Sequence, residues 1–421
     1  DEYDIPVFEQ VKALYNSIHE LTENGTIVSA YVCDANGFVP ALCKMAFGNK
    51  LGFALNSDLK EESLFAPAYG CIVAEGAKDK LDNIKTAYTK LGEVKEKAAF
   101  TYKEVSINVE EALSVWEDKL EKVFPTKVSK ETTSIETKLF NAENVHICKN
   151  KVAKPKVFIP VFPGTNCEYD SKRAFEKAGA KVELVLIRNK TEEMLKTSID
   201  ELENAIKRAN IVMLPGGFSA GDEPEGSGKF IATVLRNPRL KAAISDLLDN
   251  RDGLMIGICN GFQALIKLGL LPYGEIRDMS ENDATLTFNT IGRHLSQFVD
   301  TRIGSVKSPW LAHVNVGDVH VIPISHGEGR FVAPKEVIDE LFANGQVFSQ
   351  YVDPNRKVTM QTPYNPNGSM YAIEGIVSRD GRVLGKMGHS ERQGENRFKN
   401  VYGEMDQKLF EAGVNYFRGG K

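Results

Sequence analysis

The sequence lacks several features that would place it in a specialised class of protein. It has only six cysteines in 421 residues, at positions 33, 43, 71, 148, 167 and 259, and no two of them form a Cys-x-x-Cys pair. This spacing argues against a disulfide framework and against a zinc site, so we expect no metal. No run of about 18 apolar residues occurs, and we therefore expect no membrane span and no membrane partner.

An excess of charge of one sign is missing as well. Lys and Arg number 52 against 57 Asp and Glu, a formal net charge of −5, which does not favour nucleic acid as a partner. The acidic start Asp-Glu-Tyr-Asp is unlike the basic start of a secretory signal, so we expect a cytoplasmic location. Because the first residue is Asp1 rather than methionine, we expect the chain to be a piece of a larger protein.

What is present predicts three segments. A hydrophobic fraction of 42% is typical of globular proteins, and 421 residues suffice for two or three domains. Residues 1–125 mix helix and strand patterns without strict alternation, which predicts a small α+β domain. Residues 126–154 are rich in Lys, Thr and Glu and have little periodicity, which predicts a linker on the surface. Residues 155–421 are predicted to form an α/β domain.

In this third segment, continuous apolar runs alternate with helix patterns, as expected for a parallel sheet covered on both faces. After about residue 282 the pattern becomes more typical of antiparallel strands. In an open sheet, reactive groups gather in loops beyond the carboxyl ends of strands. The expected strands are 157–162, 182–187, 211–214, 254–258, 319–324, 371–377 and 383–387, and the loops that qualify are 164–167, 215–222 and the turn at Cys259.

The turn at Cys259 has the pattern of a nucleophile elbow. An apolar strand ends in Gly257-Ile258-Cys259-Asn260-Gly261 and runs directly into an amphipathic helix pattern. Glycines two residues before and after the cysteine permit a sharp turn that exposes the thiol above the sheet. We also expect the helix N-terminus to favour the thiolate. The alternative is an ordinary buried cysteine on a core strand.

A cysteine nucleophile needs a base and a group that orients the base. His389 follows the predicted strand 383–387, and an extended backbone places Glu391 on the same side, where it can hold the imidazole. The alternative for a His-x-Glu triplet is a solvated strand end. His326 is the second candidate base, although its loop is expected to line a substrate pocket.

Acyl chemistry also needs donors for an oxyanion. The amide of Asn260, directly after the nucleophile, and the amide of Gly217, in the Gly216-Gly217 turn, are the candidates. The alternative is a plain glycine turn after a strand. Cys167 is a rival nucleophile, but it lacks a following glycine and precedes Glu168, so it is interpreted as a wall of the site or a buried small residue.

Six motifs in order give residues 155–421 a close resemblance to a known family, the class I glutamine amidotransferase domain of phosphoribosylformylglycinamidine synthase. They depart from the usual pattern where Ser390 replaces proline and Ala220 replaces tyrosine. The motifs are Phe162-Pro163-Gly164-Thr165-Asn166-Cys167, Gly216-Gly217-Phe218-Ser219-Ala220-Gly221-Asp222, Gly257-Ile258-Cys259-Asn260-Gly261-Phe262-Gln263, Ser325-His326-Gly327-Glu328-Gly329-Arg330, Asn365-Pro366-Asn367-Gly368-Ser369 and Gly388-His389-Ser390-Glu391-Arg392.

The resemblance implies a flavodoxin-like domain in which Cys259 attacks glutamine, His389 carries the proton to the departing ammonia and Glu391 orients His389. Phe218, Gln263 and His326 are the candidate substrate-binding residues. No cofactor is implied for this step. In the complete synthase the ammonia would serve an ATP- and Mg²⁺-dependent amidation of formylglycinamide ribonucleotide. The implied partners are glutamine and the missing N-terminal synthase domains of the same polypeptide.

Residues 1–125 resemble the C-terminal half of an aminoimidazole-ribonucleotide-synthetase-like module of the single-chain synthase. The segment Cys33-Asp34-Ala35-Asn36-Gly37-Phe38 is similar to that family's Asp-x-Ser-x-Gly-Gly segment, but Phe38 replaces the second glycine. A structural or pseudo-active role is therefore favoured over phosphate binding. Two other classes of function stay open for the whole chain: a cysteine hydrolase or peptidase on the same scaffold, and a catalytically silent docking module.

Overall fold

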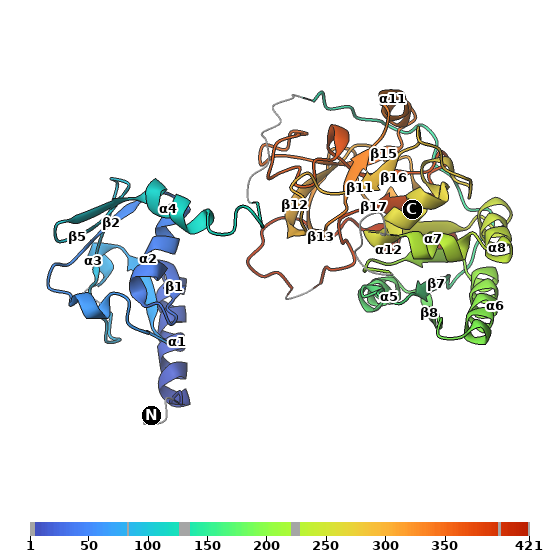
Figure 1. The fold of residues 1–421 in the computed structure, drawn as a ribbon. Helices are drawn as coiled ribbons and strands as arrows, with labels where there is room; N and C mark the ends of the chain where they lie inside the picture. The colour runs from blue at the N-terminus through green and yellow to red at the C-terminus, as the bar shows by residue number, and fades with distance from the viewer. Residues whose placement is uncertain (1–4, 82–83, 126–134, 220–227, 395–396, 420–421) are drawn as a thin grey trace. The chain divides into compact units, whose positions relative to one another are not determined.

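The computed structural model describes residues 5–81, 84–125, 135–219, 228–394 and 397–419. The chain divides into two compact units, Asp1–Thr126 and Lys127–Lys421, each of which has its own core. Within the described ranges, no helix is long and apolar enough to span a membrane. Figure 1 shows the elements of both units, coloured along the chain.

The first unit mixes helices with two small sheets. Strands β1 and β3 pair antiparallel, and a second sheet has the strand order β4-β2-β5-β6. The apolar stretch Ala68 to Val73 predicts a strand, but Ala68 to Cys71 form a turn in which the Cys71 amide donates to the Ala68 carbonyl, and the strand begins only at Ile72. The elements are α1 (Phe8–Glu23), β1 (Ile27–Val32), α2 (Phe38–Phe47), β2 (Gly52–Leu55), η1 (Glu61–Ser63), β3 (Ile72–Gly76), α3 (Lys78–Leu81), β4 (Gly92–Lys95), β5 (Ala99–Tyr102), β6 (Val105–Asn108) and α4 (Val109–Glu117).

The second unit contains a nine-stranded sheet whose parallel half confirms the predicted α/β fold. Strands β8, β7, β9, β10 and β17 are mutually parallel in that order, which is the flavodoxin-like arrangement. The pattern of residues 230–248 predicts helices, and there are two, because Asn237 caps a second helix that has Pro238 in its first turn. The elements are β7 (Lys156–Val161), α5 (Glu168–Lys177), β8 (Lys181–Leu186), α6 (Glu192–Arg208), β9 (Ile211–Leu214), α7 (Lys229–Leu235), α8 (Pro238–Asp249), β10 (Leu254–Ile258), α9 (Asn260–Leu268) and α10 (Leu270–Tyr273).

The antiparallel half continues the same sheet from β17 in the order β17-β16-β15-β12-β13. Strand β17 is therefore central and completely buried, with β10 on one side and β16 on the other. The remaining elements are β11 (Thr285–Thr287), β12 (Leu295–Ile303), η2 (Pro309–Leu311), β13 (Val319–His326), β14 (Arg330–Val332), α11 (Lys335–Ala343), β15 (Val347–Tyr351), η3 (Met370–Ala372), β16 (Ile373–Val377), β17 (Val383–Lys386) and α12 (Leu409–Arg418).

The described part of the predicted linker, residues 135–154, belongs to the second unit and packs along it without forming a helix or strand. The Phe140 amide donates to the Gly304 carbonyl, and the Val152 amide donates to the Phe417 carbonyl. Asp252 accepts hydrogen bonds from the amides of Lys149 (2.9 Å) and Asn150 (3.2 Å). Although burial alone would raise the pKa of Asp252, these amides and a contact with His146 hold that pKa below its usual range.

We expect Asp252→Asn to lower the free energy of unfolding by about 1 to 2 kcal/mol at neutral pH, since the amides of the 146–150 segment lose a charged acceptor. The pKa of Asp252 is lower in the folded chain than in the unfolded chain. The contribution of Asp252 to the free energy of unfolding is therefore complete above the unfolded pKa of about 3.9, and it is lost as the pH falls towards the folded pKa. Chemical denaturation at neutral and acidic pH measures it, with the exposed Asp249→Asn as the control. Equal stability of both variants at neutral pH would contradict it.

Candidate active site

Cys259 lies at a sharp turn between β10 and α9. Its backbone has φ 53° and ψ −108°, a region that residues with a Cβ rarely adopt. A Cβ on Gly257 would lie 2.6 Å from the carbonyl oxygen of Gly261. A Cβ on Gly261 would lie 1.9 Å from the carbonyl oxygen of Leu214. Both glycines are therefore needed for the close approach of the strands and the helix, which gives this segment the geometry of an elbow.

The adjacent parallel strand carries His389 and Glu391. Ile258 pairs with Lys386 in the sheet, and the Cys259 amide donates to the Lys386 carbonyl at 2.8 Å. The chain then continues from β17 to His389, whose Nδ1 lies 2.6 Å from Oε1 of Glu391. Both side chains are buried, and the Nε2 atom of His389 has no hydrogen-bond partner among the described residues. This second nitrogen is free to act on another group.

Gly216 is the point at which these groups converge. A Cβ built on Gly216 would lie 2.7 Å from Cε1 of His389 and 3.5 Å from Cβ of Cys259. It would also lie 3.1 Å from the sulfur of Cys167. The imidazole, the elbow cysteine and the second thiol are therefore neighbours around one glycine, although 130 residues separate Cys259 from His389 in the sequence.

We expect Gly216→Ala to lower the rate of the reaction at Cys259 by roughly 10²-fold. The new methyl group would lie too close to the imidazole of His389 and must displace it from its position. Steady-state kinetics on the natural substrate measure this effect. Gly48→Ala is the control, since a Cβ on Gly48 meets nothing within 4 Å. A Gly216→Ala variant with wild-type activity would show that the imidazole does not need its present position.

The electrostatics of Cys259 differ from the expectation that its helix N-terminus would favour the thiolate. Burial raises the pKa of the Cys259 thiol to about 12, and the nearby Cys167 and Glu391 act in the same direction. The amide of Asn260 lowers that pKa, but by less. The sulfur also approaches the Ser325 carbonyl oxygen at 3.6 Å, as a donor. The resting group is therefore a thiol, and its proton must be removed by a base as it reacts.

Glu391 has the opposite behaviour. Burial would raise the pKa of this carboxyl, but the charge and hydrogen bond of His389 hold the pKa below its usual range. The carboxylate is thus ionised where it contacts the imidazole, and it favours a positive charge on His389 once that group accepts a proton. The pair has the geometry and the charge of a base with its orienting group.

The two predicted oxyanion donors, Gly217 on a loop and Asn260 at the start of α9, lie on segments that a hydrogen bond joins. Gly217 has φ +144°, and no oxygen of the described residues accepts a hydrogen bond from its amide. The side-chain oxygen of Asn260 accepts from the Ser219 amide at 3.3 Å, which ties the glycine loop to the start of α9. Residues 220–222 of the same predicted loop lie outside the described residues. The oxyanion role of Gly217 and Asn260 stays a prediction.

The three predicted substrate-binding residues have different surroundings. The Phe218 ring lies 6.0 Å from the ring of His294. Gln263 donates to the Glu328 carbonyl at 2.6 Å and accepts from Asn260 at 2.9 Å, so both ends of its amide are engaged within the protein. This gives Gln263 a role in holding the 325–329 loop against α9. A direct contact between Gln263 and the substrate stays a prediction.

His326 keeps one ring nitrogen free. Its Nδ1 lies 3.1 Å from the side-chain oxygen of Asn289, and its Nε2 has no partner among the described residues. Burial, followed by the charges of His389 and His294, lowers the pKa of His326 to about 3. This ring is therefore neutral, and its free nitrogen accepts rather than donates a hydrogen bond if Nδ1 carries the proton. A substrate amino or amide group is a suitable donor.

Two further residues lie beside His389: Cys167, which the sequence predicts as a wall of the site or a buried small residue, and Arg392, for which the sequence predicts no role. The sulfur of Cys167 lies 3.9 Å from Nδ1 of His389, and Arg392 donates to the same sulfur at 3.0 Å. Burial, and then the charge of Glu391, raise the pKa of the Cys167 thiol to about 12. Arg392 belongs to one of the six motifs, but its contact with Cys167 could not be predicted, because it depends on a loop 225 residues away.

Cys167, His389 and Glu391 together offer ligand atoms within 4.8 Å of one another, a spacing that a metal ion could bridge. Nδ1 of His389 is engaged by Glu391, and the guanidinium group of Arg392 already places a positive charge against the thiol. We therefore interpret the cluster as the surroundings of a histidine–carboxylate pair rather than as a metal centre.

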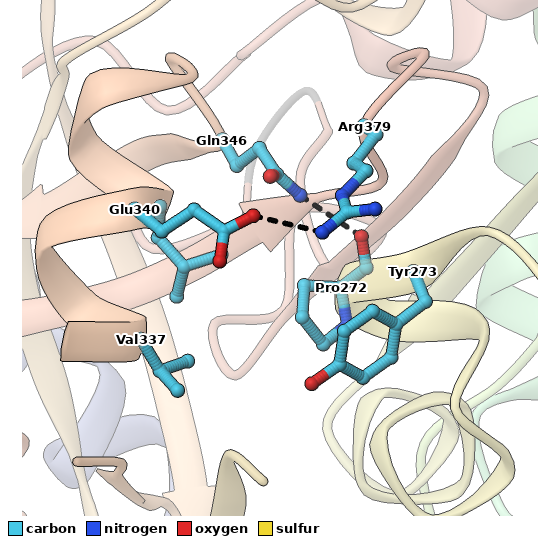
Figure 2. Close-up of a pocket in the computed structure, with 7 residues that line it drawn as sticks. Pro272, Tyr273, Val337, Glu340, Gln346 and Arg379 are labelled. Carbon is cyan, nitrogen blue, oxygen red and sulfur yellow. Dashed lines mark hydrogen bonds and ion pairs between the residues drawn. The ribbon is translucent and has the colours of Figure 1, made fainter.

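A small pocket elsewhere in the second unit is too confined to be the site. Its cavity volume is about 10 Å³, close to the space needed by one water molecule. Figure 2 shows that Arg379 reaches across it to Glu340, at 2.8 Å, and that Gln346 donates to the Pro272 carbonyl. None of the residues that line this pocket belongs to the cluster around Gly216.

Comparison with known proteins gives a consistent set of relatives. The model of the CobB/CobQ-like glutamine amidotransferase domain matches residues 154–417. The phosphoribosylformylglycinamidine synthase subunit PurQ of Methanococcus maripaludis is 35% identical over 277 residues, which are 63% of this chain and 95% of the relative. The same subunit of Treponema denticola is 34% identical, with 62% of this chain and 99% of the relative covered.

Among solved structures, a chain of PurLQS from Thermotoga maritima is 29% identical and has a TM-score of 0.45. The match covers 62% of this chain and 99% of that chain. The two PurQ relatives are thus covered over almost their whole length, and the family model lies within the second unit.

Proposed function

The chain belongs to the CobB/CobQ-like glutamine amidotransferase family, and from this premise we propose that Cys259, His389 and Glu391 form the triad with which it hydrolyses glutamine. The chain is a glutamine amidotransferase of purine biosynthesis. The observation that carries the assignment of residues is the convergence at Gly216, where the imidazole of His389 and the elbow cysteine meet.

In the proposed reaction, Nε2 of His389 takes the proton of the Cys259 thiol as the sulfur attacks the side-chain amide carbon of glutamine. The amides of Gly217 and Asn260 stabilise the oxyanion of the tetrahedral intermediate. The carbon–nitrogen bond then breaks, and His389 returns its proton to the nitrogen, which leaves as ammonia. A water molecule, deprotonated by His389, attacks the thioester, and the carbon–sulfur bond breaks to give glutamate and the free thiol.

The raised pKa of Cys259 supports this order of events. A thiol that is protonated in the resting state reacts only when a base removes its proton, and the imidazole of His389 neighbours the same glycine, Gly216, as Cys259 does. The ionised Glu391 stabilises the positive imidazole that forms. No cofactor takes part in these steps. Water exclusion in the buried site strengthens each of these electrostatic interactions.

We assign the ammonia to the amidation of formylglycinamide ribonucleotide, as the name of the PurQ relatives indicates for those proteins. ATP and Mg²⁺ would be used for that amidation at a separate site. That site would lie in synthase domains of the same polypeptide, as in a single-chain form of the synthase. Residues 1–125 would belong to this synthase part. In its loop, the Asp34 carboxylate accepts from the Asn36 amide at 2.8 Å, which supports a structural role for Asp34. The cytoplasmic location stays a prediction.

A comparison of substrates tests the proposed hydrolysis. The chain is expected to release glutamate from glutamine, to act much more slowly on asparagine and to leave peptide substrates intact. Inhibition by an electrophilic glutamine analogue is expected in the same assay. If the chain instead cleaved peptides and glutamine analogues did not inhibit that cleavage, the proposal would be wrong and the chain would be a cysteine peptidase on the same scaffold.

A further inference from the structure

The residues on both sides of His389 are held by a buried lysine that the proposed reaction does not use. Lys386, the last residue of β17, is 0% exposed. Its ammonium group lies 2.8 Å from the hydroxyl oxygen of Ser390 and 3.2 Å from the carbonyl oxygen of Gly388. A single cation thus contacts the residue before the imidazole and the residue after it.

The main chain of Lys386 contacts the other reacting group. Its carbonyl oxygen accepts the hydrogen bond from the amide of Cys259, at 2.8 Å. Lys386 therefore touches the backbone of the nucleophile with one group and the loop of the base with another. Since β17 lies between β10 and β16, both contacts are fixed by a central strand.

Two further buried groups complete this cluster. Oε1 of Glu374, on β16, lies 3.4 Å from the Lys386 ammonium and accepts from the Gly388 amide at 2.7 Å. The Ser390 hydroxyl donates to the side-chain oxygen of Gln407 at 2.6 Å. Burial lowers the pKa of Lys386, while the charges of Glu374 and Glu391 oppose that shift. The hydroxyl of Ser390 thus joins a charged pair on one side to a neutral amide on the other.

We propose that Lys386 and Ser390 are positioning residues that hold His389 and Glu391 in register with Cys259. This inference rests on the proposed function of that triad. Ser390 stands where the family that the sequence resembles usually has proline, which restrains the backbone covalently. Here the restraint is supplied by hydrogen bonds instead, from Lys386 and to Gln407.

The kinetics of inactivation by a γ-electrophilic glutamine analogue separate binding from chemistry and test this role. Ser390→Ala is expected to lower the maximal rate of Cys259 alkylation about tenfold, because the imidazole loses its alignment. The half-saturating concentration of the analogue is expected to stay within about twofold, since the substrate pocket is intact. Gln407→Met, which removes the acceptor of the same hydroxyl, is expected to act in the same direction by a smaller factor.

Ser308→Ala is the matched control. Ser308 is also buried, and its hydroxyl makes two hydrogen bonds, to Gly381 and from the Trp310 amide, at the opposite end of β17. It is expected to lower stability without changing the alkylation rate. If the wild-type chain is alkylated at Cys259 but Ser390→Ala and Gln407→Met react equally fast, the positioning role is wrong. If the wild-type chain takes no label at Cys259, the proposed function itself fails.

Discussion

Replacing Cys259 with alanine is expected to reduce glutamate release from glutamine by roughly 10³-fold or more, because the proposed thioester forms on its sulfur. The variant should fold normally, since the elbow depends on the flanking glycines and on backbone contacts. Steady-state glutamate release and thermal unfolding measure the two effects. Cys148→Ala removes another buried cysteine, distant in sequence and bonded to Asn150 instead, and should leave turnover unchanged.

The rival thiol makes this experiment decisive. Cys167 contacts both His389 and Arg392, so Cys167→Ala is expected to reduce turnover while leaving it measurable. The backbone distinguishes the two cysteines, because only Cys259 has a positive φ at the start of a helix. If Cys167→Ala abolished turnover and Cys259→Ala preserved it, the nucleophile would have been assigned to the wrong residue.

Replacing Glu391 with glutamine is expected to lower kcat by about 10³- to 10⁴-fold with little change in KM. The substitution keeps the shape of the side chain but removes the charge that stabilises a positive His389, and its amide no longer dictates which ring nitrogen carries the proton. Measurement of kcat and KM for glutamine checks this expectation.

A second histidine–glutamate pair supplies the control for that experiment. His313 lies 3.9 Å from Glu411, whose side chain is 54% exposed. Glu411→Gln removes the charge from this pair and is expected to leave kcat unchanged, since screened surface pairs contribute little. A loss of less than tenfold for Glu391→Gln, or a change confined to KM, would show that the carboxylate does not orient the base.

Much of this site can be predicted from local sequence. Glycines at positions 257 and 261 around a cysteine define the elbow, and the apolar strand before His389 places that histidine at the same edge of the sheet. Because β10 and β17 are parallel neighbours, two local patterns suffice to bring the nucleophile and the base together.

The features of the site that could not be predicted from the sequence depend on contacts between segments that are distant in the sequence. The pKa of Cys259 rises because Cys167, Glu391 and the surrounding core bury the thiol, an effect that outweighs the local helix terminus. Lys386 belongs to an apolar strand, and its pairing with Glu374 follows only from the position of β16. Gly216 could be read as a turn residue, but its closeness to His389 is a property of the folded chain.

The most direct test of the account is to identify the atom that reacts with a γ-electrophilic glutamine analogue. Mass spectrometry of the digested chain is expected to find one adduct per chain, on the sulfur of Cys259, and excess glutamine should prevent its formation. Because each chain is alkylated once, the result does not depend on the rate of turnover. An adduct on Cys167, or labelling of several cysteines that glutamine does not suppress, would contradict the assignment of Cys259 as the nucleophile.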